Sequence, residues 1–138
     1  MRIGATGPDM GAGMTKIAVL AMDETVRIDV QRLEQIIREL GEPAAAQVIG
    51  AALEQLALAL RRTVAASQRG DLGAIVASAD QLSRLAWQVG LVTLAGVAID
   101  VGACAERRDP PALAATVRRL ERIGNRSLTE LWDPPDDR

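Results

Sequence analysis

The feature that most constrains this chain is its shortage of aromatic side chains. Trp87 and Trp132 are the only aromatic residues, and Phe and Tyr are absent. A hydrophobic core must therefore be built from Leu, Ile, Val and many Ala residues. Alanine has the highest helix propensity, whereas strands favour β-branched and aromatic side chains. Together with a length of 138 residues, which suits a single domain, this composition predicts a small all-α protein.

Cap and stop residues divide residues 29–132 into a short leading helix and four longer amphipathic helices. The separators are Gly41, Gly70-Asp71, Gly90 and Asp109-Pro110-Pro111. The leading helix begins after Asp29, and its apolar face carries Val30, Leu33, Ile36, Ile37 and Leu40. Short connections between the longer helices predict an antiparallel up-down four-helix bundle. Breakers in residues 1–28 predict a flexible N-terminal tail, and residues 133–138 a C-terminal tail.

The residue types that are missing exclude whole classes of chemistry. With no His in the sequence, the chain cannot form a Ser-His-Asp triad, a Cys-His pair or a His metal ligand. A single Cys, Cys104, cannot form an intramolecular disulfide or a cysteine metal cluster, and its apolar helix predicts a small core residue. No Gly-rich phosphate loop with Lys is present. We therefore expect no enzyme activity, no metal and no cofactor.

Charge and hydropathy indicate a cytoplasmic protein without nucleic-acid or membrane partners. The net charge is −2, so no global basic field attracts nucleic acid. The arginine pairs Arg61-Arg62, Arg107-Arg108 and Arg118-Arg119 lack aromatic residues for base stacking, which favours solvated helix faces. No segment reaches about 18 consecutive apolar residues, which predicts no transmembrane helix. A lone Cys fits a reducing cytoplasm.

A further sequence pattern lies on the second of the four longer helices. Gly70-Asp71 opens this helix, Ala79-Asp80-Gln81-Leu82-Ser83-Arg84-Leu85-Ala86 follows, and Gly90 lies ten residues after Asp80. The stretch resembles the histidine-containing phosphotransfer (Hpt) domain, whose usual motif is Ala-His-x-Leu-Lys-Gly-Ser-Ala. Residues 29–42 resemble the leading helix and turn of that family, so the resemblance covers about residues 29–132. It implies a four-helix bundle that passes phosphate between receiver-domain aspartates through one exposed His.

The residues that carry the chemistry of the family differ here. Asp80 stands where the family has its phosphate-accepting His, Ser83 where it has Lys, and Arg84 where it has Gly. The resemblance therefore implies a degenerate, or pseudo-Hpt, protein. Asp80 has three interpretations: a permanent negative charge in place of phosphohistidine, a neutral surface replacement, or a phosphate acceptor. The last would need further carboxylates to hold a metal ion, and the sequence places no such cluster beside Asp80.

Helical geometry places Asp80 on an outward ridge of its helix. The expected partner-docking surface consists of Gly73, Ala77, Asp80, Ser83, Arg84, Trp87 and Leu91. An exposed Trp is a frequent binding anchor, so Trp87 and Leu91 supply apolar contacts and Arg84 a charged one. In the alternative interpretation, Trp87 packs against a neighbouring helix and the charges only solvate the surface.

Two functions are consistent with these features. The first is a non-catalytic pseudo-Hpt protein of a bacterial two-component phosphorelay. Its partner would be the receiver domain of a response regulator or hybrid histidine kinase, or the kinase itself. The second is an α-helical oligomerisation or scaffold module with only architectural kinship to Hpt domains, and the sequence leaves a homodimer open.

Overall fold

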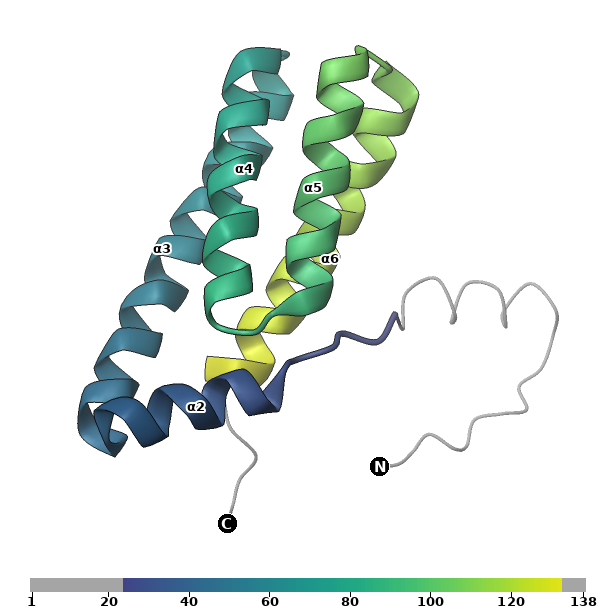
Figure 1. Cartoon of the computed structure of the whole chain (residues 1–138). Helices are drawn as coiled ribbons and strands as arrows, with labels where there is room; N and C mark the ends of the chain where they lie inside the picture. Colours follow the sequence, from purple (N-terminus) through teal and green to yellow (C-terminus); the bar gives the residue numbers. More distant parts are fainter. Residues whose placement is uncertain (1–23, 133–138) are drawn as a thin grey trace, which may run out of the picture.

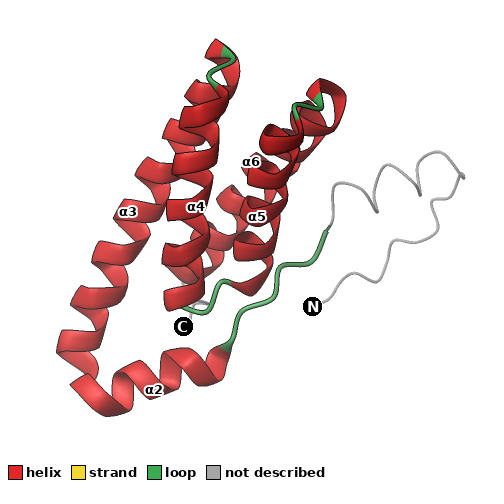
Figure 2. Ribbon diagram, turned by 45° about the horizontal axis from the view of Figure 1, so that its top comes forward, coloured by secondary structure: helices red, strands yellow, loops and turns green. Residues whose placement is uncertain are grey.

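The described part of the chain is all-helical, as the composition predicts. The computed structural model describes residues 24–132, and this part contains five helices and no strand. The helices are α2 (Val30–Leu40), α3 (Glu42–Arg69), α4 (Leu72–Gln88), α5 (Val92–Arg107) and α6 (Pro110–Trp132). In Figure 1, α3, α4, α5 and α6 lie side by side, and the chain reverses direction at each connection between them. Helix α2 lies crosswise at one end of this group, as the turned view of Figure 2 also shows.

The long helices contact one another in a closed order. Helix α3 packs on α4, α4 on α5 and α5 on α6, and α6 packs back on α3. A glycine allows close packing between α3 and α6. A Cβ at Gly124 would lie 2.7 Å from a methyl carbon of Leu60, so a larger residue at this position would force the Leu60 side chain to move.

Aspartate side chains cap three of the helices at the positions that the sequence indicates. Asp29 Oδ1 accepts a hydrogen bond from the backbone N–H of Arg32 at 3.2 Å. Asp71 Oδ1 accepts one from Ala74 at 3.1 Å, and Asp109 Oδ1 accepts one from Ala112 at 3.3 Å. Each bond satisfies an amide that would otherwise lack a partner in the first helical turn.

The buried core is almost entirely aliphatic. Its largest fully buried apolar side chains are Leu56, Ile75, Leu82, Leu91, Leu94, Val97, Val101, Leu120 and Ile123. Cys104 is also buried, which confirms its prediction as a core residue. The buried hydroxyl of Thr63 lies 2.8 Å from the carbonyl oxygen of Ala59 and 3.0 Å from the Ser78 hydroxyl. This polar group is therefore satisfied inside the core.

The segment before α2 packs against the helices, although the sequence assigns it to the flexible tail of residues 1–28. Val26 and Ile28 are partly buried against the core, and Ile28 forms an antiparallel bridge with Leu91. The backbone N–H of Asp29 donates to the carbonyl of Gly90 at 2.7 Å. The ordered domain thus begins before residue 29. The remaining tail predictions, for residues 1–23 and 133–138, lie outside the described residues.

The turn between α4 and α5 depends on Gly90. Its φ of +81° lies in the left-handed region, and a Cβ there would lie 2.8 Å from the carbonyl oxygen of Asp29. Only glycine combines this backbone conformation with so close an approach of the preceding segment. The sequence predicts a bend or break near Gly90, and the end of α4 at Gln88 confirms it.

Helix α2 does not bury the apolar face that its periodicity indicates. None of its residues is buried. Leu33 and Ile36 are half-buried, whereas Val30, Ile37 and Leu40 are exposed. The reason is its position: α2 lies across the end of the other helices (Figure 1) and contacts only α3 extensively. A helix placed crosswise covers its neighbours with a few residues rather than with a whole face.

Helix α3 is long and apolar enough to cross a membrane, by length and composition only. Its most apolar 18-residue window has a mean hydropathy of 1.3, and 28% of that window is buried. Core helices of soluble proteins pass the same test, so a single helix of this kind is weak evidence for a membrane location. The prediction of a protein without membrane-spanning segments stays a prediction.

An ion-pair group fastens the segment before α2 to α6. Arg119 donates to the Glu24 carboxylate through Nε at 3.0 Å and through Nη2 at 2.6 Å. Arg122 Nη2 lies 3.9 Å from the same carboxylate, and Arg119 Nη1 lies 3.7 Å from Asp100. The hydrogen bonds from Arg119, more than the nearby charges, hold the pKa of Glu24 below its ordinary value, and partial burial opposes this effect.

The lowered pKa of Glu24 predicts a small acid-dependent loss of stability. The unfolded carboxyl binds a proton more readily than the folded one, so its contribution is complete above the ordinary glutamate pKa of about 4.3 and disappears as the pH falls through the lowered value. Glu24→Gln should cost about 1 kcal/mol or less near neutral pH, because the pair is partly exposed. Urea unfolding of both proteins at several pH values checks this. Equal pH slopes for the wild type and the variant would contradict it.

Candidate functional site

The outward ridge of α4 carries most of the residues that the sequence assigns to partner docking. Helix α4 starts at the Asp71 cap and buries one face against α3 and α5. On its opposite side, the structure exposes Gly73, Ala77, Asp80, Arg84 and Trp87. These residues lie three or four positions apart, which places them one above another along a single helix face. The predicted ridge therefore exists as a continuous exposed surface, except at the two positions described next.

Two residues of the expected docking surface are withdrawn from solvent. The Ser83 side chain is 9% exposed, and its hydroxyl donates to the carbonyl of Asp80 at 2.8 Å. Leu91 is fully buried, so its prediction as a docking contact is wrong. The helical periodicity that places Leu91 on the ridge ends at Gln88. The left-handed conformation of Gly90 then redirects the chain and turns Leu91 into the core.

An ion pair occupies the centre of the ridge. The Arg84 guanidinium donates to the Asp80 carboxylate from one helical turn away. More than half of each side chain is exposed, so solvent screens the pair and its contribution to stability is small. The consequence for chemistry is larger. A neighbouring cation hydrogen-bonds to the Asp80 carboxylate and offsets part of its charge locally.

A shallow apolar groove between α4 and α5 adjoins this ion pair. It encloses about 340 Å³ and is lined by Ser83, Arg84, Trp87, Val92, Ala95, Gly96 and Ile99. Trp87 is 57% exposed and Ile99 is 61% exposed, so two large apolar side chains stand beside a floor of small residues. The alternative interpretation, in which Trp87 packs against a neighbouring helix, therefore applies only to the part of the Trp87 surface that is not exposed.

Gly96 and Ile99 were not recognisable as site residues from the expected ridge of α4, because they belong to another helix. A signal for Ile99 does exist in the sequence. The core-facing positions of α5, which include Leu94, Ala98 and Val101, are all buried. Ile99 lies off that face, and a large apolar residue on the polar side of a helix is the observation that indicates an interaction surface.

A second groove lies on the other side of the ridge, between α3 and α4. It encloses about 370 Å³, and its lining consists of Arg62, Ala65, Arg69, Ala74, Ala77, Ser78 and Gln81. Two arginines from α3 thus stand beside Ala77 of the ridge. This arrangement offers positive charge to an acidic partner. Arg62, a member of the Arg61-Arg62 pair, thus lies at the edge of this groove.

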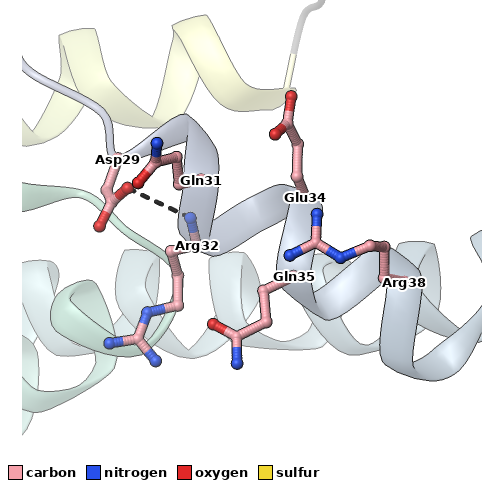
Figure 3. A pocket seen from close by; sticks show the side chains of 6 residues that line it. All are labelled: Asp29, Gln31, Arg32, Glu34, Gln35 and Arg38. Carbon is pink, nitrogen blue, oxygen red and sulfur yellow. Dashed lines mark hydrogen bonds between the residues drawn. The ribbon is translucent and has the colours of Figure 1, made fainter.

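A surface hollow of about 430 Å³ along α2 does not form a convergent site. All of its lining residues belong to α2 or its cap: Asp29, Gln31, Arg32, Glu34, Gln35 and Arg38. Figure 3 shows Glu34 pointing away from Arg32 and Gln35. The Asp29 carboxylate is engaged in capping the helix, as the dashed bond to the Arg32 backbone indicates. Side chains that diverge in this way surround no common position for a ligand.

The described residues give the ridge no evident reactive chemistry. Within residues 24–132, no three Cys, Asp or Glu side chains are grouped so that they could hold a metal ion. The Asp80 and Arg84 side chains form an ion pair with each other. What the arrangement does offer is an exposed surface with an ion pair, an apolar anchor and two grooves. Such a surface suits recognition of another macromolecule.

Comparison of the chain with protein-family models, with curated proteins and with solved structures finds no match.

Proposed function

We propose that this protein is a non-catalytic pseudo-Hpt protein that acts in the cytoplasm in a two-component phosphorelay. It docks on the receiver domain of a response regulator or hybrid histidine kinase, or on the kinase, and modulates phosphate flow by occupying that partner. The observation that carries the proposal is the exposed α4 ridge. It presents the Asp80–Arg84 ion pair next to the exposed Trp87, where the Hpt resemblance places the contact with receiver domains.

The arrangement of the helices supports the proposed architecture. The closed order of contacts among α3, α4, α5 and α6, with a reversal at each connection (Figure 1), is what an antiparallel up-down four-helix bundle requires. Helix α2 takes the place of the short leading helix of the family. We therefore interpret the fold as Hpt-like.

The ion pair bears on the role of Asp80. A carboxylate that acts as a constant substitute for phosphohistidine should present its charge to the partner. Arg84 instead donates to the carboxylate and reduces that charge. This favours Asp80 as a neutral surface replacement over a charge mimic. Arg84 also fills the position where the family has Gly, so it adds bulk beside the position of the family's acceptor.

Phosphotransfer assays test the proposal and its view of Arg84. The wild type should take no phosphate from a phosphorylated receiver, yet it should slow transfer from that receiver to an active Hpt protein by competition. Asp80→His should gain little transfer, because Arg84 still places a bulky cation beside position 80. Asp80→His combined with Arg84→Gly should gain more, with Asp80→Asn combined with Arg84→Gly as the inactive control. Failure to compete for any receiver of the source organism would contradict the proposal.

A second function, an oligomerisation or scaffold module, is favoured by the amount of exposed apolar surface. Val30, Leu40, Val48, Trp87 and Ile99 are each close to half exposed or more. Burial of such side chains between subunits is a common source of affinity. In this case the relation to Hpt domains is architectural only, and receivers would not bind.

A further inference from the structure

An uncharged apolar run lies directly before the described part of the chain. Residues 17–22 read Ile-Ala-Val-Leu-Ala-Met, and Asp23 and Glu24 follow them. Moving apolar side chains out of water is favourable in proportion to the area that is buried. A run of this kind therefore gains free energy from an apolar surface that it can reach, and the position of Glu24 decides which surface that is.

Glu24 places the beginning of the described chain beside α5. Its carboxylate accepts hydrogen bonds from Arg119 of α6, and Arg119 also lies 3.7 Å from Asp100 of α5. Three residues after Glu24, the backbone N–H of Arg27 donates to the Thr93 hydroxyl of α5 at 2.8 Å. The segment before α2 therefore runs along the side of α5 that faces α6 and is turned away from α4 (Figure 1).

The α4–α5 groove opens on the other side of α5, and Gly96 lies between the two sides. Successive residues of a helix are 100° apart, which places Gly96 between Ile99, which lines the groove, and Asp100, which lies on the α6 side. A Cβ built on Gly96 would have no atom within 4 Å. No described residue thus requires glycine here, although glycine is a poor residue for the interior of a helix. A further chain segment that crosses α5 closely would require it.

The chain before Glu24 is long enough to cross α5 at this point. A helix with its side chains is about 10–12 Å wide, and four extended residues span about 13 Å. A chain that leaves Glu24 and crosses over Gly96 thus brings Leu20 to the α4–α5 groove. There it meets Trp87 and Ile99, which are 57% and 61% exposed and so have apolar surface left to cover.

We propose that residues 17–22 bind in the α4–α5 groove of their own chain, with Leu20 against Trp87 and Ile99 and with the chain crossing α5 over Gly96. The covalent connection makes this contact intramolecular, so a short apolar run is held at a high effective concentration beside the groove. The contact needs no receiver and stands apart from the proposed function. It also has a consequence for that function: Trp87 serves both contacts, so the segment and a receiver compete for it.

Fluorescence of the full chain tests the contact, in a Trp132→Phe background that leaves Trp87 as the only tryptophan. Leu20→Asp puts a charge against the apolar groove and should release the segment. The emission of Trp87 should then shift to longer wavelength and become easier to quench with acrylamide, because water reaches the indole. Ala5→Asp adds the same charge outside the apolar run and is the matched control, for which we expect no shift. Circular dichroism verifies the helices of each variant.

Gly96→Leu tests the crossing point. Its side chain fills the gap on α5 and leaves no room for the segment, while leucine improves helix propensity. Leu20→Asp should therefore cause no further shift of the Trp87 emission when Gly96→Leu is already present. Gly50 is the control position, because it is a helical glycine of α3 that also has no atom within 4 Å of a Cβ. In Gly50→Leu, the full shift caused by Leu20→Asp should remain.

Three results would overturn the contact. The first is a Trp87 emission that Leu20→Asp leaves unchanged, and the second is a shift that persists in full in Gly96→Leu. The third is a Trp87 emission that moves to shorter wavelength only as the protein concentration rises, because a second copy of the chain then covers the indole.

Receiver binding distinguishes a failure of this contact from a failure of the proposed function. If both hold, Leu20→Asp binds receivers more tightly than the wild type does, because the competing segment has left Trp87. If Leu20→Asp shifts the Trp87 emission but no receiver binds either protein, only the proposed function fails. If receivers bind and Leu20→Asp shifts nothing, only the intramolecular contact fails.

Discussion

Leu82→Ala is expected to lower the free energy of unfolding by about 2–5 kcal/mol. Leu82 is fully buried at the centre of α4 and belongs to the cluster that joins the long helices. Removing its isobutyl group deletes apolar contacts and leaves a cavity. The surrounding helices cannot collapse into it easily, because the core cluster contains several alanines, which have no longer side chain to adjust. The loss should therefore lie well above that of an average substitution.

Denaturant unfolding monitored by circular dichroism at 222 nm measures this loss. Leu85→Ala is the matched control, since Leu85 is on the same helix but only partly buried. Its substitution changes helix propensity in the same direction and by the same amount, so the difference between the variants isolates burial. A loss for Leu82→Ala no greater than that for Leu85→Ala would contradict the described core.

Gly90→Ala is expected to destabilise the protein by more than Gly70→Ala, although both glycines have positive φ. Gly70 ends α3 at φ +69°, and a Cβ there would meet no atom within 4 Å. Alanine at position 70 therefore costs only the free energy of holding a residue with a side chain in the left-handed conformation, about 1–2 kcal/mol. At Gly90 the same conformational cost is joined by a Cβ only 2.8 Å from the Asp29 carbonyl oxygen. Relief of that contact requires displacement of the backbone before α2.

Two readouts distinguish the conformational cost from the clash. Thermal unfolding compares the total destabilisation of the two variants. Hydrogen exchange of the Asp29 amide reports the segment itself, because this amide donates to the Gly90 carbonyl. We expect faster exchange at Asp29 in Gly90→Ala and unchanged exchange in Gly70→Ala. Equal destabilisation with unchanged Asp29 exchange would mean that the segment does not pack on the turn as described.

The helix boundaries could be predicted from the sequence because their signals are local. Glu42-Pro43 marks the start of α3, Gly70 its end, and Asp109 the cap of α6, and each acts within a few residues of its own position. Burial on α4 could be predicted for the same reason. Its face is defined by a periodicity of 3.6 residues, as the buried Ile75 and Leu82 show.

The features that could not be predicted depend on contacts between distant residues. Glu24 meets Arg119 across 95 positions of sequence, and no local pattern announces such a pair. The prediction of Leu91 as a docking contact is wrong because helical periodicity cannot be extended across a glycine that changes the direction of the chain. The apolar residues of α2 define a face, but they do not say what covers it. The α4–α5 groove likewise needs two helices to be placed side by side before Gly96 and Ile99 join Trp87.

The most direct test of the central claim is a binding titration of the purified chain against the receiver domains of its source organism. The account predicts selective binding with a dissociation constant in the micromolar range, about 8 kcal/mol of binding free energy. Trp87→Ala should weaken that binding by about tenfold or more, as expected of an aromatic anchor. Glu54→Ala, an exposed position on α3, should leave it unchanged. Absence of binding to every receiver, or binding that Trp87→Ala leaves intact, would contradict a docking role for the α4 ridge.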